Sequence, residues 1–286
     1  MVKIENNYQI IDSATSVDLH SMKPVHEARL RIAGSYTEPE MGHMNKTIFN
    51  LDNISLLLAG QEPGVDSPYF DYVFHPGVDE IEYVLSSRGL MCYPDGKKYE
   101  VRPGHCMFHA ADYPHRLHNI GQNETLNLIV VLSEHMSKVS RKCSPEEVRV
   151  ETEGGHKLVF CPEHPATPDH NLPGDPDGLL VSNIYEGAKT CFAYVTLKPG
   201  FSAPECDFMA GKDHNELIYV LGGTGLGVYP DKVYELRQGL IAYNPPGQPV
   251  KYINNSNDDL VLAYFCSKAK LSDVEYSIVK ASGFEE

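Results

Sequence analysis

The second half of this chain repeats the first, and this repeat constrains the fold more than any other feature of the sequence. Aligning Glu216 with Glu80 gives an offset of 136 residues that needs no gap over a long stretch. The matches at this offset are Pro63-Gly64 with Pro199-Gly200, Pro68 with Pro204, Asp71 with Asp207, Tyr83-Val84-Leu85 with Tyr219-Val220-Leu221, Gly89 with Gly225, and Tyr93-Pro94-Asp95 with Tyr229-Pro230-Asp231. After one deletion the offset is 135, and Tyr99-Glu100, Arg102, Gly104 and Asn119 fall on Tyr234-Glu235, Arg237, Gly239 and Asn254. Chance cannot plausibly produce so many matches with one gap, so the two halves are predicted to share one fold.

Each half consists of short apolar runs separated by Gly, Pro, Asp and Asn, a pattern typical of the strands of a β-sandwich or β-barrel. The runs extend from residue 54 to about residue 132 and start again after Leu179. We therefore predict an all-β protein with a few short helices. Its predicted parts are an N-terminal extension packing on the first barrel (residues 1–50), a first barrel (51–150), a linker (151–180), a second barrel (181–270) and a C-terminal tail (271–286).

Charge and composition argue against several classes of partner. The formal net charge is −15, with 39 acidic residues against 24 Lys and Arg, which disfavours binding to nucleic acid. The N-terminus lacks the apolar core of a secretory signal, and no apolar segment has the ~20 residues that a membrane span needs. The seven cysteines are scattered without a Cys-x-x-Cys pair, so neither a disulfide framework nor a thiolate zinc site is indicated. We expect a cytoplasmic protein that binds neither nucleic acid nor membranes.

Two histidines and a glutamate in the first half have the chemistry of a metal site. The residues are His75, Glu80 and His115. They lie too far apart in sequence to meet on one local element, but neighbouring strands of a small barrel can bring them together. Two neutral imidazole nitrogens with one carboxylate suit a divalent first-row metal and leave coordination positions open.

The same residues resemble the motifs of the cupin superfamily. His75 matches the second histidine of the family's first motif, Glu80 its glutamate, His115 the histidine of the second motif and Asn119 its closing asparagine. The chain departs from the family at two places: Val73 stands where the first motif has another histidine, and Ala110-Ala111-Asp112 replaces the Pro-x-Gly of the second motif. Three family ligands are therefore present where the family usually has four.

The resemblance implies a tandem two-barrel protein, or bicupin, built by internal duplication from jelly-roll type barrels. It further implies a substrate pocket inside each barrel and one divalent transition metal ion, Fe, Mn, Ni or Zn, in the N-terminal barrel. Because cupin barrels often associate edge to edge, which hides unpaired strands, we also expect a homodimer.

Residues found in only one of the two copies are the best candidates for chemistry, because residues in both copies are needed by the fold. The first-half residues His75, Glu82, His109 and His115 align with Gly211, Ile218, Asn244 and Val250. Only the glutamate of the metal motif survives in the second copy, as Glu216. The second barrel is therefore predicted to hold no metal, and His214 is expected on a surface loop.

Glu82 and His109 are the predicted catalytic residues. Strand alternation places Glu82 on the same face as Glu80, and an inward carboxylate is costly unless it has a partner. Glu82 is interpreted as a general acid or base beside the metal; the alternatives are a group that supports or supplements the ligands and an outward, solvated side chain. His109 is the second candidate for proton transfer.

Two functions follow from these observations. The first is a metal-dependent enzyme whose N-terminal barrel acts on a small polar substrate, such as a keto or hydroxy acid, a sugar acid or an enediol, by isomerase, lyase or dioxygenase chemistry. The alternative is a non-catalytic bicupin that binds a sugar or another metabolite, and the missing histidine at Val73 favours it.

Overall fold

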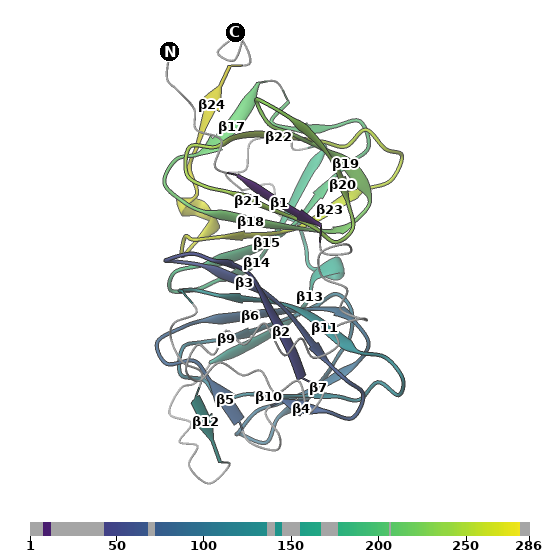
Figure 1. The fold of residues 1–286 in the computed structure, drawn as a ribbon, viewed down its shortest axis with the longest axis vertical. Helices are drawn as coiled ribbons and strands as arrows, with labels where there is room; N and C mark the ends of the chain where they lie inside the picture. The colour runs from purple at the N-terminus through teal and green to yellow at the C-terminus, as the bar shows by residue number, and fades with distance from the viewer. Residues whose placement is uncertain are drawn as a thin grey trace. The chain divides into compact units, whose positions relative to one another are not determined.

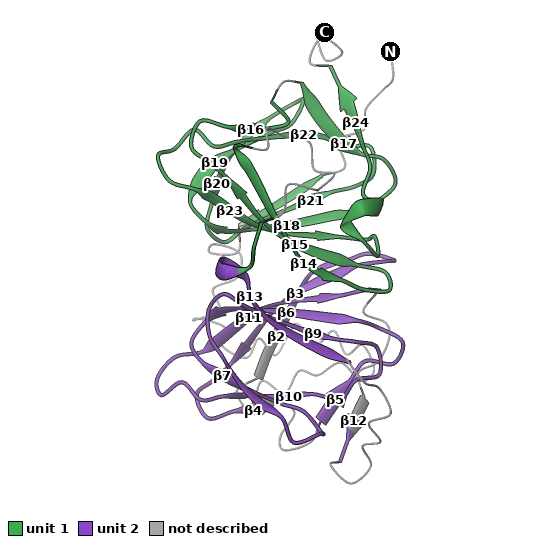
Figure 2. Ribbon diagram, turned by 180° about the vertical axis from the view of Figure 1, so that it is seen from behind, with its two compact units in different colours: residues 1–17, 164–286 green, residues 18–163 purple. Residues whose placement is uncertain are grey.

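The computed structural model describes residues 8–12, 43–67, 72–135, 141–144, 155–166, 177–205 and 207–280. These residues form β-strands and two short 3-10 helices, η2 (Cys161–Glu163) and η3 (Leu271–Asp273). The chain divides into two compact units (Figure 2). In chain order, the first unit is residues 18–163, purple and labelled unit 2 in the figure, and the second unit is residues 1–17 with 164–286, green and labelled unit 1. None of the described helices is long and apolar enough to cross a membrane.

The first unit is a barrel made of two antiparallel sheets. One sheet has the order β13 (His156–Phe160), β9 (His105–His109), β6 (Glu80–Ser86), β11 (Leu126–Leu132), β3 (Ser55–Gln61) and β2 (His43–Asn50). The other has the order β4 (Asp66–Ser67), β10 (Arg116–Asn119), β7 (Gly89–Cys92) and β8 (Lys98–Val101). A further pair, β12 (Arg141–Cys143) and β5 (Tyr72–Phe74), is joined to β10 through a bridge between Val73 and His115.

The hydrophobic core lies between these sheets, which Figure 1 shows on opposite sides of the first barrel. Leu57, Val84 and Met107 come from the first sheet, and Met91 and Leu117 come from the second. Alternation along each strand turns these side chains inward. Burying each such side chain stabilises the fold by about 1.5–3 kcal/mol relative to leaving it exposed.

The second unit has the same strand order. Its first sheet runs β1 (Gln9–Asp12), β21 (Leu240–Asn244), β18 (Glu216–Gly222), β23 (Leu260–Cys266), β15 (Cys191–Leu197) and β14 (Leu179–Glu186). Its second runs β20 (Val233–Arg237), β19 (Thr224–Val228), β22 (Pro249–Ile253), β17 (Phe208–Gly211) and β24 (Tyr276–Val279), with β16 (Ser202–Ala203) also paired to β22. The prediction of an all-β protein with two tandem barrels is confirmed.

One asparagine that the two halves share has the same structural role in both barrels. Asn119 donates from its side-chain amide to the carbonyl oxygens of Gln61 and Glu124 at 2.8 and 2.9 Å. Its counterpart Asn254 donates to two backbone carbonyls of the second barrel at 2.7 and 2.8 Å. Each asparagine therefore fixes a loop to a strand end, which explains why it occurs in both copies.

One edge strand of each six-stranded sheet comes from a part of the chain that was not predicted to belong to a barrel. Strand β13 lies inside the predicted linker and pairs with β9 over its whole length. Strand β1 lies in the predicted N-terminal extension and pairs with β21 of the second unit. Strand β24, from the predicted tail, pairs with β17. Each of these strands satisfies backbone groups that would otherwise form an open sheet edge. Residues 13–42 of the predicted extension lie outside the described part of the chain.

Candidate metal centre

The structure brings His75, Glu80 and His115 together at one end of the first barrel. His75 follows strand β5, Glu80 begins β6 and His115 directly precedes β10. Backbone hydrogen bonds of 2.9 Å in both directions between Val73 and His115 hold the start of β10 beside β5. Strand pairing thus assembles three side chains that are distant in the sequence.

The three side chains have the geometry of a metal site. The Nε2 atoms of His75 and His115 each lie 3.0 Å from Oε2 of Glu80. The ligand atoms all lie within 4.8 Å of one another. Glu80 Oε2 is buried, and no hydrogen-bond donor with suitable geometry reaches it in the described structure. A buried carboxylate oxygen left without a donor is costly, so these residues fit a divalent cation that all three atoms would bind together.

The electrostatics of the cluster follow from burial and from the pairing of opposite charges. Burial alone would raise the pKa of Glu80, but the charges of His75 and His115 hold it well below its usual value. Burial alone would lower the pKa of His75, but the charge of Glu80 raises it overall. Glu80 is therefore ionised at neutral pH, as a metal ligand must be.

The ring of His115 is oriented by the chain next to it. Its Nδ1 atom lies 3.2 Å from the backbone carbonyl oxygen of Tyr113. A proton on Nδ1 would be donated to this oxygen, which leaves the Nε2 lone pair directed at the cluster. This is the tautomer that a metal at Nε2 requires.

Glu82 and His109 form a second buried pair beside the ligands. Glu82 is only 7% exposed, so it does not have the outward, solvated position that was one of its three interpretations. His109 Nε2 lies 3.3 Å from Glu82 Oε2, and the His109 ring stacks on the His115 ring with centroids 3.8 Å apart. The two predicted catalytic residues therefore lie beside the candidate metal ligands.

The pKa shifts of Glu82 and His109 both favour the uncharged form of the side chain. Burial raises the pKa of Glu82 to about 8, and the negative charge of Glu80 contributes to this rise. Burial, together with the charge of His115, lowers the pKa of His109 well below its usual value. A bound divalent cation would favour the carboxylate form of Glu82, because opposite charge lowers the pKa of an acid.

Three ring side chains next to this pair, those of Tyr93, Tyr113 and His156, were not predicted from the sequence to lie near the site. The ring of Tyr93 stacks on the ring of His156 with centroids 3.8 Å apart, and His156 Nδ1 lies 3.0 Å from the Tyr113 hydroxyl. His156 belongs to β13, and its place in the barrel depends on the pairing with β9. The one available signal was Tyr93, which the repeat matches to Tyr229.

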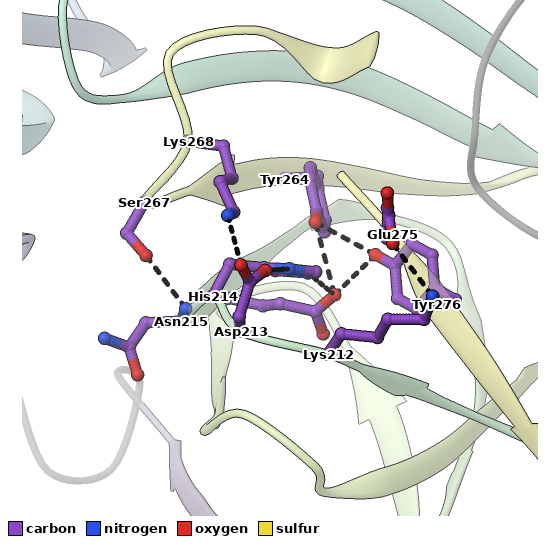
Figure 3. A network of polar contacts seen from close by, with 10 residues as sticks. Lys212, Asp213, His214, Asn215, Tyr264, Ser267, Lys268, Glu275 and Tyr276 are labelled. Atoms are coloured by element: carbon purple, nitrogen blue, oxygen red, sulfur yellow. Dashed lines mark hydrogen bonds and ion pairs between the residues drawn. The ribbon is translucent and has the colours of Figure 1, made fainter. Parts of the chain in front are cut away.

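The equivalent place in the second barrel has a different chemistry (Figure 3). Glu216 accepts hydrogen bonds at Oε1 from the hydroxyl groups of Tyr264, at 3.2 Å, and Tyr276. Its Oε2 accepts one from the amide of Asn244 at 3.1 Å. Unlike Glu80, this carboxylate has hydrogen-bond donors at both oxygens.

The expectation that His214 lies on a surface loop is wrong. His214 is 0% exposed, and its Nε2 lies 3.3 Å from Glu216 Oε1. A Cβ atom placed on Gly211 would lie 2.7 Å from this same Nε2. Because Gly211 matches His75, the His214 ring fills the space that a side chain at the His75 position would need. Because Gly211 has no side chain, the imidazole of His214, three residues later, can occupy this space.

Val73 occupies the position of the missing fourth ligand and gives a testable prediction. It lies two residues before His75 on an extended segment, so the two side chains share a face. We expect Val73→His to tighten metal binding, because a further imidazole would join the ligand set. Isothermal titration of the metal-free protein with Mn(II) measures the change. An affinity equal to that of the unmodified protein would mean that residue 73 does not face the ion.

Comparisons with known proteins agree with this fold. Residues 59–132 match the model of the Cupin domain family. No curated protein matches the chain. A salicylate 1,2-dioxygenase from Pseudoaminobacter salicylatoxidans, solved in complex with gentisate, has a TM-score of 0.70 at 11% identity, covering 96% of this chain and 87% of that one.

Two further solved structures share the architecture. A putative glyoxylate-induced protein from Pseudomonas aeruginosa has a TM-score of 0.64 at 12% identity, covering 91% of this chain and 88% of that one. An oxalate decarboxylase from Bacillus subtilis has a TM-score of 0.55 at 12% identity, covering 86% of this chain and 76% of that one. At such low identity these similarities establish the fold and no more.

Proposed function

We propose that this protein, which has a cupin domain at residues 59–132, is a metal-dependent enzyme whose N-terminal barrel acts on a small polar substrate. The observation that carries the proposal is the convergence of His75, Glu80 and His115 on one point, with Glu80 Oε2 lacking a hydrogen-bond donor among the described residues. The substrate class is a keto or hydroxy acid, a sugar acid or an enediol. Isomerase, lyase and dioxygenase chemistry all suit such a site.

His75, Glu80 and His115 would hold one divalent ion of Fe, Mn, Ni or Zn. Bound there, it would supply a Lewis acid for a chelating pair of substrate oxygens and for negative charge that develops on them. The protein's own part is to keep Glu80 ionised, to direct the Nε2 atom of His115 at the site and to exclude water by burial.

Glu82 and His109 would handle the proton in this proposal. Glu82 lies next to the ligands, and its pKa of about 8 in the absence of metal is close to the range at which a carboxyl group can both give and take a proton at neutral pH. His109 is neutral and contacts Glu82 at 3.3 Å, so it can hold the carboxyl group in place. Its ring also packs on His115, which couples the orientation of the ligand to that of the acid.

The likeness to other structures supports the substrate class only in general terms. The names of two similar proteins specify salicylate and oxalate, both small organic acids whose oxygens can chelate a metal. A small organic acid is consistent with a site that places a cation beside a buried acid-base pair.

We propose in addition that the chain arose by internal duplication and is a bicupin in which the second barrel has lost its metal. This history is supported by three observations: the strand order matches in the two barrels, Asn119 matches Asn254, and the glutamate occurs in both halves as Glu80 and Glu216. In the second barrel a cavity of about 30 Å³ lies next to Glu216, with mostly apolar walls. Homodimer formation and a cytoplasmic location stay predictions.

The second candidate function is a non-catalytic binder of a sugar or another metabolite. Val73 favours it, because a ligand set of three leaves the ion less tightly held than the usual four. In this case Glu82 and His109 would recognise the metabolite rather than move a proton.

Metal analysis followed by a substrate screen tests the proposal. Purified protein should contain close to one equivalent of a divalent first-row metal by elemental analysis. The Co(II)-loaded protein should change its visible absorption when keto or hydroxy acids are added, and one class of these compounds should be turned over, as followed by proton NMR. Spectral change without turnover would favour the binder, and absence of metal affinity would refute both versions of the metal site.

A further inference from the structure

The hydroxyl group of Tyr93 is buried inside the first barrel without a hydrogen-bond partner. Tyr93 is 1% exposed, and its OH contacts no donor or acceptor within the described chain. The tyrosine belongs to the core cluster between the two sheets, and its ring is fixed by stacking on His156. Leaving such a group unpaired costs stability, so a tyrosine here needs a reason that phenylalanine would not satisfy.

The second barrel contains the same tyrosine with its hydroxyl paired. Tyr229, which the repeat aligns with Tyr93, donates to Oδ1 of Asn244 at 2.8 Å. Asn244 in turn donates to Oε2 of Glu216 at 3.1 Å. A chain of hydrogen bonds therefore leads from this tyrosine to the glutamate of the metal motif.

This chain is interrupted in the first barrel by two substitutions. The residue that matches Asn244 is His109, and its Nε2 is engaged by Glu82, which Ile218 replaces in the second barrel. The Nδ1 atom of His109 has no partner within the described chain either. The first barrel thus keeps two buried polar atoms unpaired on the route from Tyr93 to Glu80, where the second barrel has a complete network.

The ring of Tyr93 lies near the candidate site. Its ring centroid lies 5.7 Å from that of His109, which stacks on the ligand His115. Burial raises the pKa of the Tyr93 hydroxyl, and the charge of Glu82 raises it further. The hydroxyl is therefore protonated and can donate a hydrogen bond.

We infer that Tyr93 is a substrate-binding residue whose hydroxyl donates a hydrogen bond to a carboxylate or carbonyl oxygen of an organic acid bound at the His75, Glu80 and His115 cluster. The inference rests on the proposed function, because it assumes that the acid binds there. The substrate oxygen would accept the hydrogen bond of Tyr93, as Asn244 Oδ1 accepts that of Tyr229 in the second barrel. Tyr229, by the same comparison, is structural.

Thermal stability separates a hydroxyl kept for a ligand from one that supports the fold. Tyr93→Phe removes an unpaired group, so the Tm of the metal-free protein should stay unchanged or rise by about 2–4 °C. The matched variant Tyr229→Phe leaves Asn244 without its donor, so its Tm should fall by a similar amount. Differential scanning calorimetry of both variants and the unmodified protein measures this. A fall in Tm for Tyr93→Phe as large as that for Tyr229→Phe would overturn the inference.

Ligand affinity supplies the second measurement. The Co(II)-loaded protein is titrated with oxalate, pyruvate and lactate, and the tightest of the three is compared across the variants. Tyr93→Phe should weaken it by about 10-fold, the effect of losing one hydrogen bond to a charged group, with Co(II) content unchanged. Tyr229→Phe should leave the affinity within about two-fold.

The possible failures are distinct. If the unmodified protein binds a probe and Tyr93→Phe binds it equally well, the role of Tyr93 is refuted while the proposed function stands. If the unmodified protein holds Co(II) but binds none of the three acids, the proposed substrate class is wrong and the inference fails with it.

Discussion

His115→Ala is expected to remove most of the metal from the purified protein. The substitution deletes one of three ligand atoms that lie within 4.8 Å of one another. Losing even a group that only supports a ligand usually weakens metal binding by about 10–100-fold, so loss of the ligand itself should cost more than about 100-fold. Elemental analysis after dialysis, with the metal per chain as the measured quantity, decides the outcome.

Glu216→Gln is the matched control for this experiment. Glu216 is the surviving residue of the same motif in the second barrel, and its oxygens are already held by Tyr264, Tyr276 and Asn244. The variant should keep the full metal content of the unmodified protein. Equal losses in His115→Ala and Glu216→Gln, or no loss in either, would contradict the assignment of the metal to the first barrel.

Much of the fold could be predicted because the repeat constrains it twice. A strand pattern in one half alone is weak evidence for a fold. The same pattern repeated at an offset of 136 residues is stronger evidence, because one fold must fit both halves. The cluster of His75, Glu80 and His115 was predicted from the chemistry of its residue types and from the motif resemblance, and the repeat added that both histidines are absent from the second copy. Alternation also predicted the buried position of Glu82, since strand geometry fixes the face on which a side chain lies.

The features that sequence reasoning missed depend on contacts between distant segments. Strand β13 is a barrel strand only because β9 offers it an edge, and nothing in its own five residues indicates that partner. His214 was expected on a surface loop because the second copy lacks the other metal ligands, but Gly211 leaves a space that its imidazole fills. Local patterns predict strands well and their partners poorly, because pairing is decided by the whole sheet.

The two barrels surround the same glutamate position with different side chains. Both keep the glutamate at the start of the central strand, as Glu80 and Glu216. In the second barrel, hydroxyl and amide groups of tyrosine and asparagine donate hydrogen bonds to the glutamate oxygens. In the first barrel, the Nε2 atoms of two histidines lie 3.0 Å from Glu80 Oε2, but neither has the geometry of a hydrogen-bond donor to it. A carboxylate with its donors in place is a structural group, whereas one that lacks them has capacity for a cation.

Glu82→Gln is expected to lower turnover by about 100-fold or more while leaving the metal content near normal. The change keeps the shape of the side chain and removes its proton exchange, and loss of a general acid or base typically has an effect of this size. Glu82 is suited to this role because it is buried beside Glu80 and contacts His109 at 3.3 Å. Turnover of the substrate found in the screen and metal per chain are measured on the same preparation, with Glu216→Gln as the control for replacing a buried glutamate.

The two measurements together distinguish the remaining interpretations of Glu82. If Glu82 only supports the ligands, metal affinity should fall first, by about 10–100-fold, and turnover per bound metal should stay close to that of the unmodified protein. Full activity with full metal would show that Glu82 takes no part in the chemistry. His109→Asn would then be the next variant, because it installs at that position the residue that the second barrel already has and tests whether the imidazole alone moves the proton.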